Sequence, residues 1–202
     1  MSEILLLSGG VDSAAIAAWK RPERCLFVDY GQRPAVGECR AARQVAAALD
    51  LMLDEIHADC SSVGSGLLAG GSHDRRTRFD HPSPEWWPFR NQLLVTIAAA
   101  HAIHVGLSIV VAGTVASDGQ RHVDGTPGFY HRLDKLVAMQ EGNVRVTAPA
   151  AEIDSVELLE RSGLTDAVLG WTHSCHVDDL ACGTCPGCVK RRDVLAAAGR
   201  LQ

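Results

Sequence analysis

The residues best suited to chemistry lie near the start of the chain, where an apolar run ends in two glycines flanked by hydroxyl side chains. The loop comprises Ser8, Gly9, Gly10, Val11, Asp12 and Ser13. Glycines let the backbone bend so that its N–H groups converge on an anion, and a helix that begins here adds the positive end of its dipole. The loop therefore predicts a phosphate site, although a glycine pair followed by Ser or Asp also makes ordinary strand-to-helix turns.

A second reactive group is a cluster of cysteines within residues 171–202. Four of the seven cysteines crowd together, at Cys175, Cys182, Cys185 and Cys188. This crowding favours a metal over disulfides, and four thiolates suit structural zinc in a closed tetrahedral site. Disulfides, an iron–sulfur cluster, or a zinc site with His173 or His176 as one ligand are the alternatives. Loss of one cysteine is expected to unfold this segment.

Three further motifs follow predicted strands or begin a predicted helix. They supply Asp29, Tyr30 and Gln32 after one strand, Arg90 and Asn91 at a helix start, and Gly113 and Asp118 after another strand. Each motif alone fits an ordinary turn or helix cap. In a doubly wound sheet, however, all of these positions face the crevice at the carboxyl ends of the strands. Their joint order predicts one pocket, shared with the glycine loop.

These residues need a scaffold in which strands and helices alternate. Strands are expected at 3–7, 24–29, 51–57, 107–112 and 144–148, and helices at 12–20, 35–49, 92–105, 133–140 and 154–161. Short apolar strands rich in β-branched residues are typical of parallel sheets. The expected fold is therefore α/β, with a doubly wound parallel sheet. Residues 60–88 lack any period and are expected to form a long functional loop.

Composition narrows the classes of function. The chain has 202 residues, of which 47% are hydrophobic, enough for one domain with a small appendage. Its net charge of -5 argues against strong nucleic-acid binding. No apolar run approaches the ~18 to 20 residues that span a bilayer, and no signal-peptide pattern is present. We expect a cytoplasmic protein that does not act in a membrane.

The glycine loop resembles that of the N-type ATP pyrophosphatases, the PP-loop family. It lacks the lysine of the Walker motif, which disfavours an NTPase that grips the γ-phosphate. The resemblance implies cleavage of ATP between the α- and β-phosphates, with release of pyrophosphate and transfer of AMP to the substrate.

Taken with residues 29–33, Arg90, Asn91 and residues 171–188, the loop resembles the 7-cyano-7-deazaguanine synthase family, called QueC, over almost the whole chain. The resemblance implies a fold like that of the adenine nucleotide alpha hydrolases. The implied reaction adenylates 7-carboxy-7-deazaguanine, captures the acyl adenylate with ammonia as an amide, and then activates the amide and eliminates to the nitrile. ATP, magnesium, one structural zinc and a homodimer go with it.

The same resemblance implies a role for each matching residue. The loop residues Ser8 to Ser13 would bind the nucleotide phosphates, and the four clustered cysteines would bind zinc. Arg90 would be the catalytic cation at the α-phosphate, and Asp118 a second catalytic residue. Asn91, Gly113, Asp29, Tyr30 and Gln32 would complete the nucleotide and substrate pocket.

The sequence departs from the family pattern at several positions. Pro34 replaces a histidine, Gly125-Thr126 replace a cysteine and an arginine, Ser155 replaces a lysine expected to face phosphate, and His173 replaces a tryptophan. Because these segments are expected to surround the substrate, we predict a divergent paralogue. It would keep the adenylation step and differ in the acceptor, which could be another amine, even one on a protein.

Two other functions compete. A PP-loop tRNA-modifying enzyme would share the loop and often carries cysteine pairs, but the acidic balance argues against it. A non-catalytic, zinc-stapled interaction module would explain the lost lysine and histidine. The expected division is a PP-loop ATP pyrophosphatase domain at 1–170 and a zinc-binding segment at 171–202 packed on it.

Overall fold

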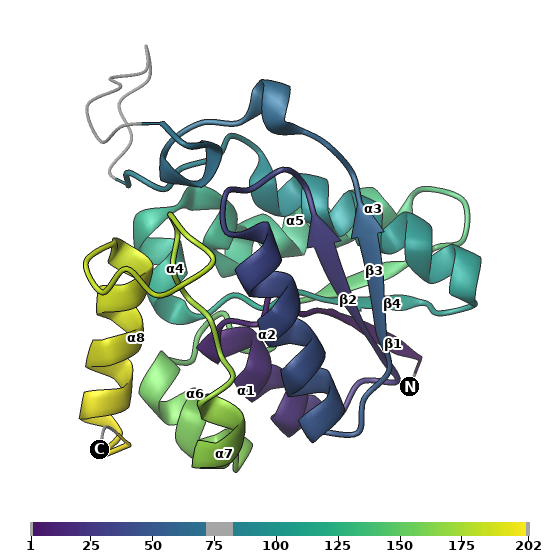
Figure 1. The fold of residues 1–202 in the computed structure, drawn as a ribbon. Coiled ribbons are helices and arrows are strands. Elements are labelled where there is room, and N and C mark those ends of the chain that lie inside the picture. The colour runs from purple at the N-terminus through teal and green to yellow at the C-terminus, as the bar shows by residue number, and fades with distance from the viewer. Residues whose placement is uncertain (1, 72–82, 201–202) are drawn as a thin grey trace.

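A five-stranded parallel sheet between two layers of helices forms the body of the protein, as the computed structural model of residues 2–71 and 83–200 shows (Figure 1). The strands are β1 (Glu3–Leu6), β2 (Arg24–Asp29), β3 (Leu53–His57), β4 (Ile109–Val111) and β5 (Arg145–Thr147). Their order is β3-β2-β1-β4-β5, and every neighbouring pair is parallel. The expected doubly wound α/β fold is confirmed. Its winding reverses between β1 and β4, where such sheets bind ligands.

Helices connect and cover the strands. They are α1 (Val11–Lys20), α2 (Ala35–Ala48), α3 (Arg90–Val105), α4 (Ala116–Arg121), α5 (Pro127–Ala138), α6 (Ser155–Ser162), α7 (Asp166–Leu169) and α8 (Pro186–Ala197). Three short 3-10 turns lie at Ser61–Val63, Leu67–Ala69 and Val123–Gly125. None of these described helices is both long and apolar enough to cross a bilayer.

The helix expected at 133–140 begins earlier than the sequence pattern indicated. α5 starts at Pro127 because the Thr126 side chain accepts a hydrogen bond from the Phe129 amide and proline suits the first helical position. The sequence patterns predicted no helix at α4, α7 or α8. Of the long loop expected at 60–88, residues 72–82 lie outside the described part of the chain.

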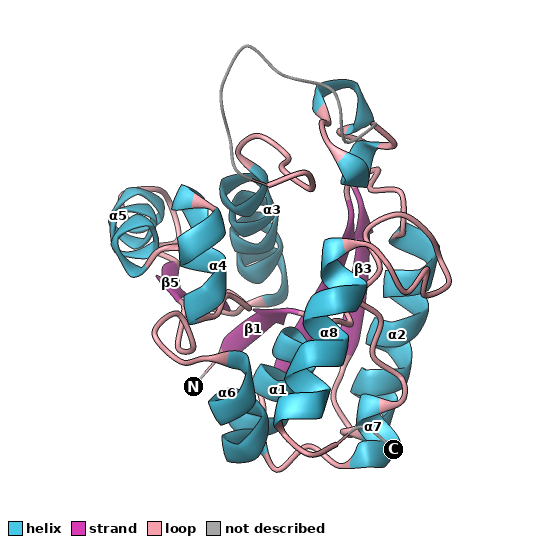
Figure 2. Ribbon diagram, turned by 90° about the vertical axis from the view of Figure 1, so that its left-hand side faces the viewer, coloured by secondary structure: helices cyan, strands magenta, loops and turns pink. Residues whose placement is uncertain are grey.

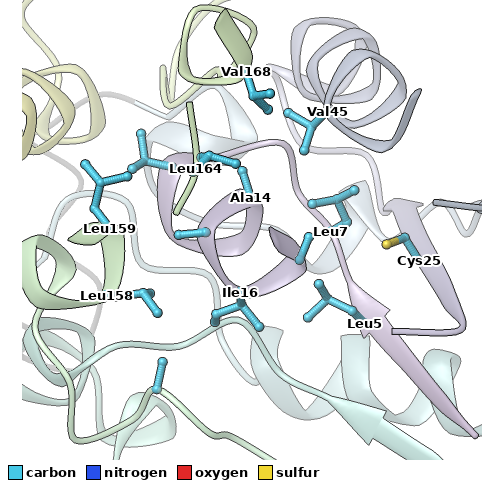
Figure 3. Close-up of a cluster of buried hydrophobic side chains, with 14 of the residues drawn as sticks. Leu5, Leu7, Ala14, Ile16, Cys25, Val45, Leu158, Leu159, Leu164 and Val168 are labelled. Atoms are coloured by element: carbon cyan, nitrogen blue, oxygen red, sulfur yellow. The ribbon is translucent and has the colours of Figure 1, made fainter. Parts of the chain in front are cut away.

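One hydrophobic core lies between the sheet and the helices α1, α2, α6 and α7. Leu7, Ile16 and Leu159, which Figure 3 labels, belong to this core and are at most 1% exposed. Burying a leucine or isoleucine contributes about 1.5 to 3 kcal/mol. This packing holds α1 at a fixed position after β1, and so fixes the loop between them.

The opposite face of the sheet is covered by α3 and α5. Buried alanines at 98, 99 and 102 let α3 lie close to the strands, while Tyr130 and Leu133 of α5 fill the space beside it. At the carboxyl ends of the strands, polar side chains such as Ser8, Asp12 and Asn91 line a cavity together with apolar side chains of both cores.

Residues 171–200 pack against the rest of the described chain. Figure 2 shows α8 on the same face of the molecule as α4, and Leu195 of α8 joins the core that contains α1. The Asp179 carboxylate accepts a hydrogen bond from the Gly37 amide at 2.8 Å, and its carbonyl accepts one from Arg40 at 2.6 Å. These contacts join residues 179–195 to α1 and α2, while the division into a PP-loop domain and a zinc-binding segment stays a prediction.

Candidate functional site

The glycine loop joins β1 to α1 in a conformation that only glycine adopts easily. Gly9 has φ of 80°, and a Cβ there would lie 2.7 Å from the Ala41 Cβ and 2.8 Å from the Glu38 carbonyl oxygen. Gly10 is the N-cap of α1, with extended backbone and space for a Cβ. The loop therefore packs tightly against α2 at Gly9, which fixes the direction of the amides that follow.

Two hydroxyl groups line the same loop. Ser8 Oγ lies 3.1 Å from Ser13 Oγ, and Ser13 Oγ donates to the Gly10 carbonyl at 3.1 Å. The Gly10 amide donates to Ser8 Oγ at 3.4 Å. Backbone amides, hydroxyl groups and the positive end of α1 converge here, an arrangement that binds phosphate groups.

The loop lies in a cavity of about 290 Å³ at the carboxyl ends of the strands. Among its lining residues are Ser8, Gly10, Val11, Asp12, Ser13, Tyr30, Gln32, Arg90, Asn91, Gly113 and Asp118. The predicted motifs thus meet in one place. Gly9 and Asp29 are absent from the lining. Gly9 faces α2, while the Asp29 carboxylate accepts from the Gly31 amide at 3.0 Å and lies 3.2 Å from His57.

Lys190, which no sequence motif singles out, also lines this cavity. Lys190, on α8, places its Nζ 2.9 Å from Asp12 Oδ2 and 3.0 Å from Asp118 Oδ1. Burial lowers the pKa of Lys190, but the two carboxylates more than offset it, so the net pKa is raised and the side chain is charged. The cavity therefore holds a fixed cation beside the phosphate loop.

Arg90 supplies a second cation from the start of α3. Burial lowers its pKa, while Tyr30 and Asp124 raise it, with a net rise that keeps the guanidinium charged. Tyr30 itself is buried and makes an edge-to-face contact with Trp87, with ring centroids 4.9 Å apart. Arg90 thus faces the cavity from a well-packed wall.

Glu38 introduces a titratable group near neutral pH. Burial raises its pKa to about 7, against a smaller lowering by the hydrogen bond from Gln32 Nε2 at 2.8 Å. The side-chain oxygen of Gln32, Oε1, in turn accepts a hydrogen bond from the Tyr30 backbone amide at 2.8 Å. Gln32 therefore links the chain after β2 to α2, as well as facing the cavity.

The side chains of Asn91 and Asp118 both form hydrogen bonds with backbone groups. Asn91 Nδ2 donates to the Asp124 carbonyl at 2.9 Å, and its amide reaches the Asp124 carboxylate at 3.3 Å. Asp118 Oδ2 accepts from the Val115 amide at 3.1 Å, as in a helix-capping box. Asp118 Oδ1 is the oxygen that faces Lys190.

The four clustered cysteines also come together. Their Sγ atoms all lie within 4.8 Å of one another, with Cys182 to Cys188 and Cys175 to Cys185 each at 3.9 Å. Backbone amides point at the sulfurs: those of His176 and Cys188 reach Cys185 Sγ at 3.3 and 3.5 Å. Such amide donors stabilise thiolates, so the set fits a cation that binds four sulfurs.

The cysteine segment contacts the phosphate loop directly. The His173 amide donates to the Gly9 carbonyl at 2.9 Å, and both His173 and Ser174 line the cavity. Lys190 follows the last cysteine by two residues, at the start of α8. A metal held by these cysteines would therefore stabilise the position of both the loop and Lys190.

The departures from the family pattern fall in different environments. His173 lines the cavity, but Pro34, Gly125, Thr126 and Ser155 are not among its lining residues. Ser155 is buried at the start of α6, and its Oγ has no hydrogen-bond partner within the described residues. Of the changed residues, only His173 lies at the cavity, and their role around a substrate stays a prediction.

Comparison with known proteins extends the resemblance seen in the sequence. The family described as "Queuosine biosynthesis protein QueC" matches residues 2–199. The 7-cyano-7-deazaguanine synthase of Anaeromyxobacter dehalogenans (strain 2CP-C) is 31% identical over 97% of this chain and 92% of its own length. That of Desulforudis audaxviator (strain MP104C) is 31% identical over the full length of both chains.

A solved structure shares the fold at lower similarity. The U34-tRNA thiolase NcsA from Methanococcus maripaludis, solved with its 4Fe-4S cluster, superposes with a TM-score of 0.52 at 16% identity. The match covers 98% of this chain but only 64% of that one, and it shows the fold alone. From the match over residues 2–199 and the full-length relatives, the chain belongs to the QueC family.

Proposed function

We propose that this protein is an ATP-dependent ligase that adenylates 7-carboxy-7-deazaguanine and joins it to ammonia, leading to 7-cyano-7-deazaguanine. The observation that carries the proposal is the shared cavity, where the glycine loop, Arg90 and the Lys190 ammonium surround one anion-binding space. The names of the full-length relatives support the choice of substrate and product.

In the first step a substrate carboxylate oxygen attacks the α-phosphorus of ATP. The bond from that phosphorus to the oxygen bridging the β-phosphate breaks, and pyrophosphate leaves with the electron pair. No proton moves, but negative charge builds on the α-phosphate and on the leaving group. The amides at the start of α1, Arg90 and Lys190 would stabilise that charge, because preorganised donors in a water-poor site act strongly.

In the second step the amine nitrogen attacks the acyl carbon of the adenylate. AMP leaves with the electron pair of the broken C–O bond, and the nitrogen loses one proton to give the amide. In a second activation the amide oxygen would attack the α-phosphorus of another ATP and release pyrophosphate. Loss of the two N–H protons, with AMP leaving by cleavage of the C–O bond, would then give the nitrile.

Magnesium would bind beside the loop. Carboxylate oxygens and nucleotide phosphates are its usual ligands, and Asp12 is the carboxylate nearest the start of α1. Lys190 takes one Asp12 oxygen, which leaves the other for the ion. When bound, magnesium would neutralise charge on the pyrophosphate leaving group.

Zinc is the metal we propose for the cysteines. Zn–S bonds of about 2.3 Å in a tetrahedron place sulfurs about 3.8 Å apart. Two sulfur pairs here lie at 3.9 Å and the whole set lies within 4.8 Å. The sulfurs that hold a cubane iron–sulfur cluster must surround four irons, so they lie farther apart. The geometry thus supports one ion over a cluster.

The acceptor is the part of the reaction open to a second candidate. His173 and Lys190 both line the cavity, and His173 stands where the family has tryptophan, which favours a test of amines other than ammonia. A protein amine is one such acceptor.

The homodimer implied by the family resemblance belongs to the proposal as well, and light scattering after gel filtration measures it.

The proposal is tested by incubating the pure protein with ATP, magnesium, 7-carboxy-7-deazaguanine and ammonia, then following AMP and products by mass spectrometry. We expect AMP together with the amide or nitrile. AMP formed without either product, with an amine adduct appearing only when another amine is added, would favour the alternative acceptor. Absence of AMP with this acid would contradict the substrate. Strong, steeply salt-dependent tRNA binding would favour a tRNA-modifying enzyme instead.

A further inference from the structure

Glu85 is a buried acidic residue in the cavity whose charge is only half satisfied. It is 4% exposed and lines the cavity that holds the glycine loop. Its Oε1 lies 2.5 Å from Arg121 and 3.6 Å from His122. Its Oε2 is buried and has no hydrogen-bond partner among the described residues. An orphan carboxylate oxygen in a pocket indicates a missing donor, because burying it unpaired is costly.

The local structure holds this side chain in place. Ser83 and Trp87, on either side, are each 2% exposed, and Trp87 packs edge-to-face on Tyr30. The Pro84 carbonyl accepts from the Leu67 amide at 2.9 Å. Because the chain is fixed around it, Glu85 cannot swing into solvent to solvate its free oxygen.

The carboxylate is ionised. Burial alone would raise its pKa, but the His122 and Ser83 side chains, with the Arg121 charge behind them, lower it to about 2. An ionised carboxylate accepts hydrogen bonds and donates none. The missing partner must therefore present N–H or O–H groups.

We infer that Glu85 recognises the N1–H and 2-amino edge of the deazaguanine ring through its unpartnered Oε2. This inference rests on the proposed function and adds the residue that selects the base. A guanine-type edge presents adjacent N–H donors, and a carboxylate is their complementary acceptor. Arg121 holds Oε1 and so turns Oε2 toward the ligand. Glu85 is thus a specificity-determining residue.

An ammonium ion is the other donor with suitable chemistry, since the proposed reaction consumes an amine. The adenylation step needs no amine, so its rate distinguishes a site for the base from a site for the ammonium ion. If Glu85 binds the base, a change at Glu85 alters adenylation itself. If it binds the amine, only amide formation changes.

The test compares two acids, 7-carboxy-7-deazaguanine and its analogue without the 2-amino group, in ATP–pyrophosphate exchange and in calorimetric binding. The proteins are the wild type, Glu85→Gln, and Glu160→Gln as a surface control. A site built to bind a donor group rejects an analogue that lacks this group. We therefore expect the wild type and the control to prefer 7-carboxy-7-deazaguanine over the analogue by about 100-fold or more. In Glu85→Gln we expect that preference to fall below about tenfold, through loss of kcat/KM for the amino form alone.

Retained discrimination in Glu85→Gln would overturn the inference, provided melting curves show it folded. Unchanged exchange with a raised KM for ammonia would also overturn it, in favour of the amine. If the wild type binds 7-carboxy-7-deazaguanine and Glu85→Gln does not, the role of Glu85 in recognising the base is supported even when no AMP forms. The absence of AMP would then contradict the proposed reaction alone. No binding of either acid to the wild type overturns both.

Discussion

Lys190 Nζ lies 2.9 Å from Asp12 Oδ2, although the two residues are 178 positions apart in the sequence. This contact joins α8, which contains Cys188 of the cysteine cluster, to the first turn of the helix after the phosphate loop. The PP-loop chemistry and the metal segment are therefore one structural system.

Replacing Lys190 should remove charge stabilisation without removing the loop. We expect Lys190→Met to lower ATP–pyrophosphate exchange by about 100-fold or more, because preorganised charge at a transition state contributes that much. Lys190→Arg should retain part of the rate. Lys135→Met, at an exposed position of α5, is the matched control. Exchange by Lys190→Met within about threefold of wild type would show that Lys190 acts only in structure.

Gly9 should tolerate no side chain. Gly9→Ala adds both a left-handed backbone penalty and a Cβ 2.7 Å from Ala41, so we expect a loss of about 2 to 4 kcal/mol in unfolding free energy. Gly106 has nearly the same φ, 77°, but open space around its Cβ. Gly106→Ala should therefore cost only about 1 to 2 kcal/mol in urea denaturation. Equal losses would mean that contact with α2 does not matter.

Glu38 should make stability depend on pH. Its folded pKa of about 7 lies above the ordinary 4.5, so the fold favours the protonated form. The stability that this provides is complete below pH 4.5 and is lost as pH rises through 7.

Glu38→Gln mimics the protonated form and should match wild type at pH 4.5. At pH 8 it should exceed wild type by about 1 to 3 kcal/mol in urea denaturation. Glu141→Gln, on the surface, controls for net charge. A Glu38→Gln gain that does not grow between the two pH values would exclude this assignment.

Removing one cysteine should affect both metal and catalysis. We expect one zinc per wild-type chain by elemental analysis, and less than stoichiometric zinc in Cys182→Ser, with a lower melting temperature. Exchange activity should fall as well, because the His173 amide bonds the Gly9 carbonyl. Cys60→Ser, outside the cluster, should keep its zinc. Iron in the wild-type protein, together with a visible charge-transfer band, would contradict the zinc assignment and indicate an iron–sulfur cluster.

The parts of the protein that local sequence patterns govern were well predicted. β2 falls at Arg24–Asp29 as expected, because an apolar run bounded by charges leaves little choice of register. The four cysteines were predicted to meet because their spacing is itself a ligand pattern.

The rest depends on contacts that no local pattern records. Lys190 and Glu85 can be recognised as site residues only from their contacts with other elements. Lys190 contacts Asp12 and Asp118, and Glu85 contacts Arg121. The missed α8 did leave a signal, since Cys185 caps it, Pro186 occupies its first position and Gly199 follows its end. α4 was missed because its six residues contain a glycine and lack an apolar stripe.

The hydrogen bond from His173 to Gly9 also orders events during synthesis. The phosphate loop is made early, yet two of its partners, the His173 amide and the Lys190 ammonium, lie in the last part of the chain to be synthesised. A nascent chain that still lacks residues 173–190 therefore has neither the Gly9 contact nor the Lys190 cation beside Asp12.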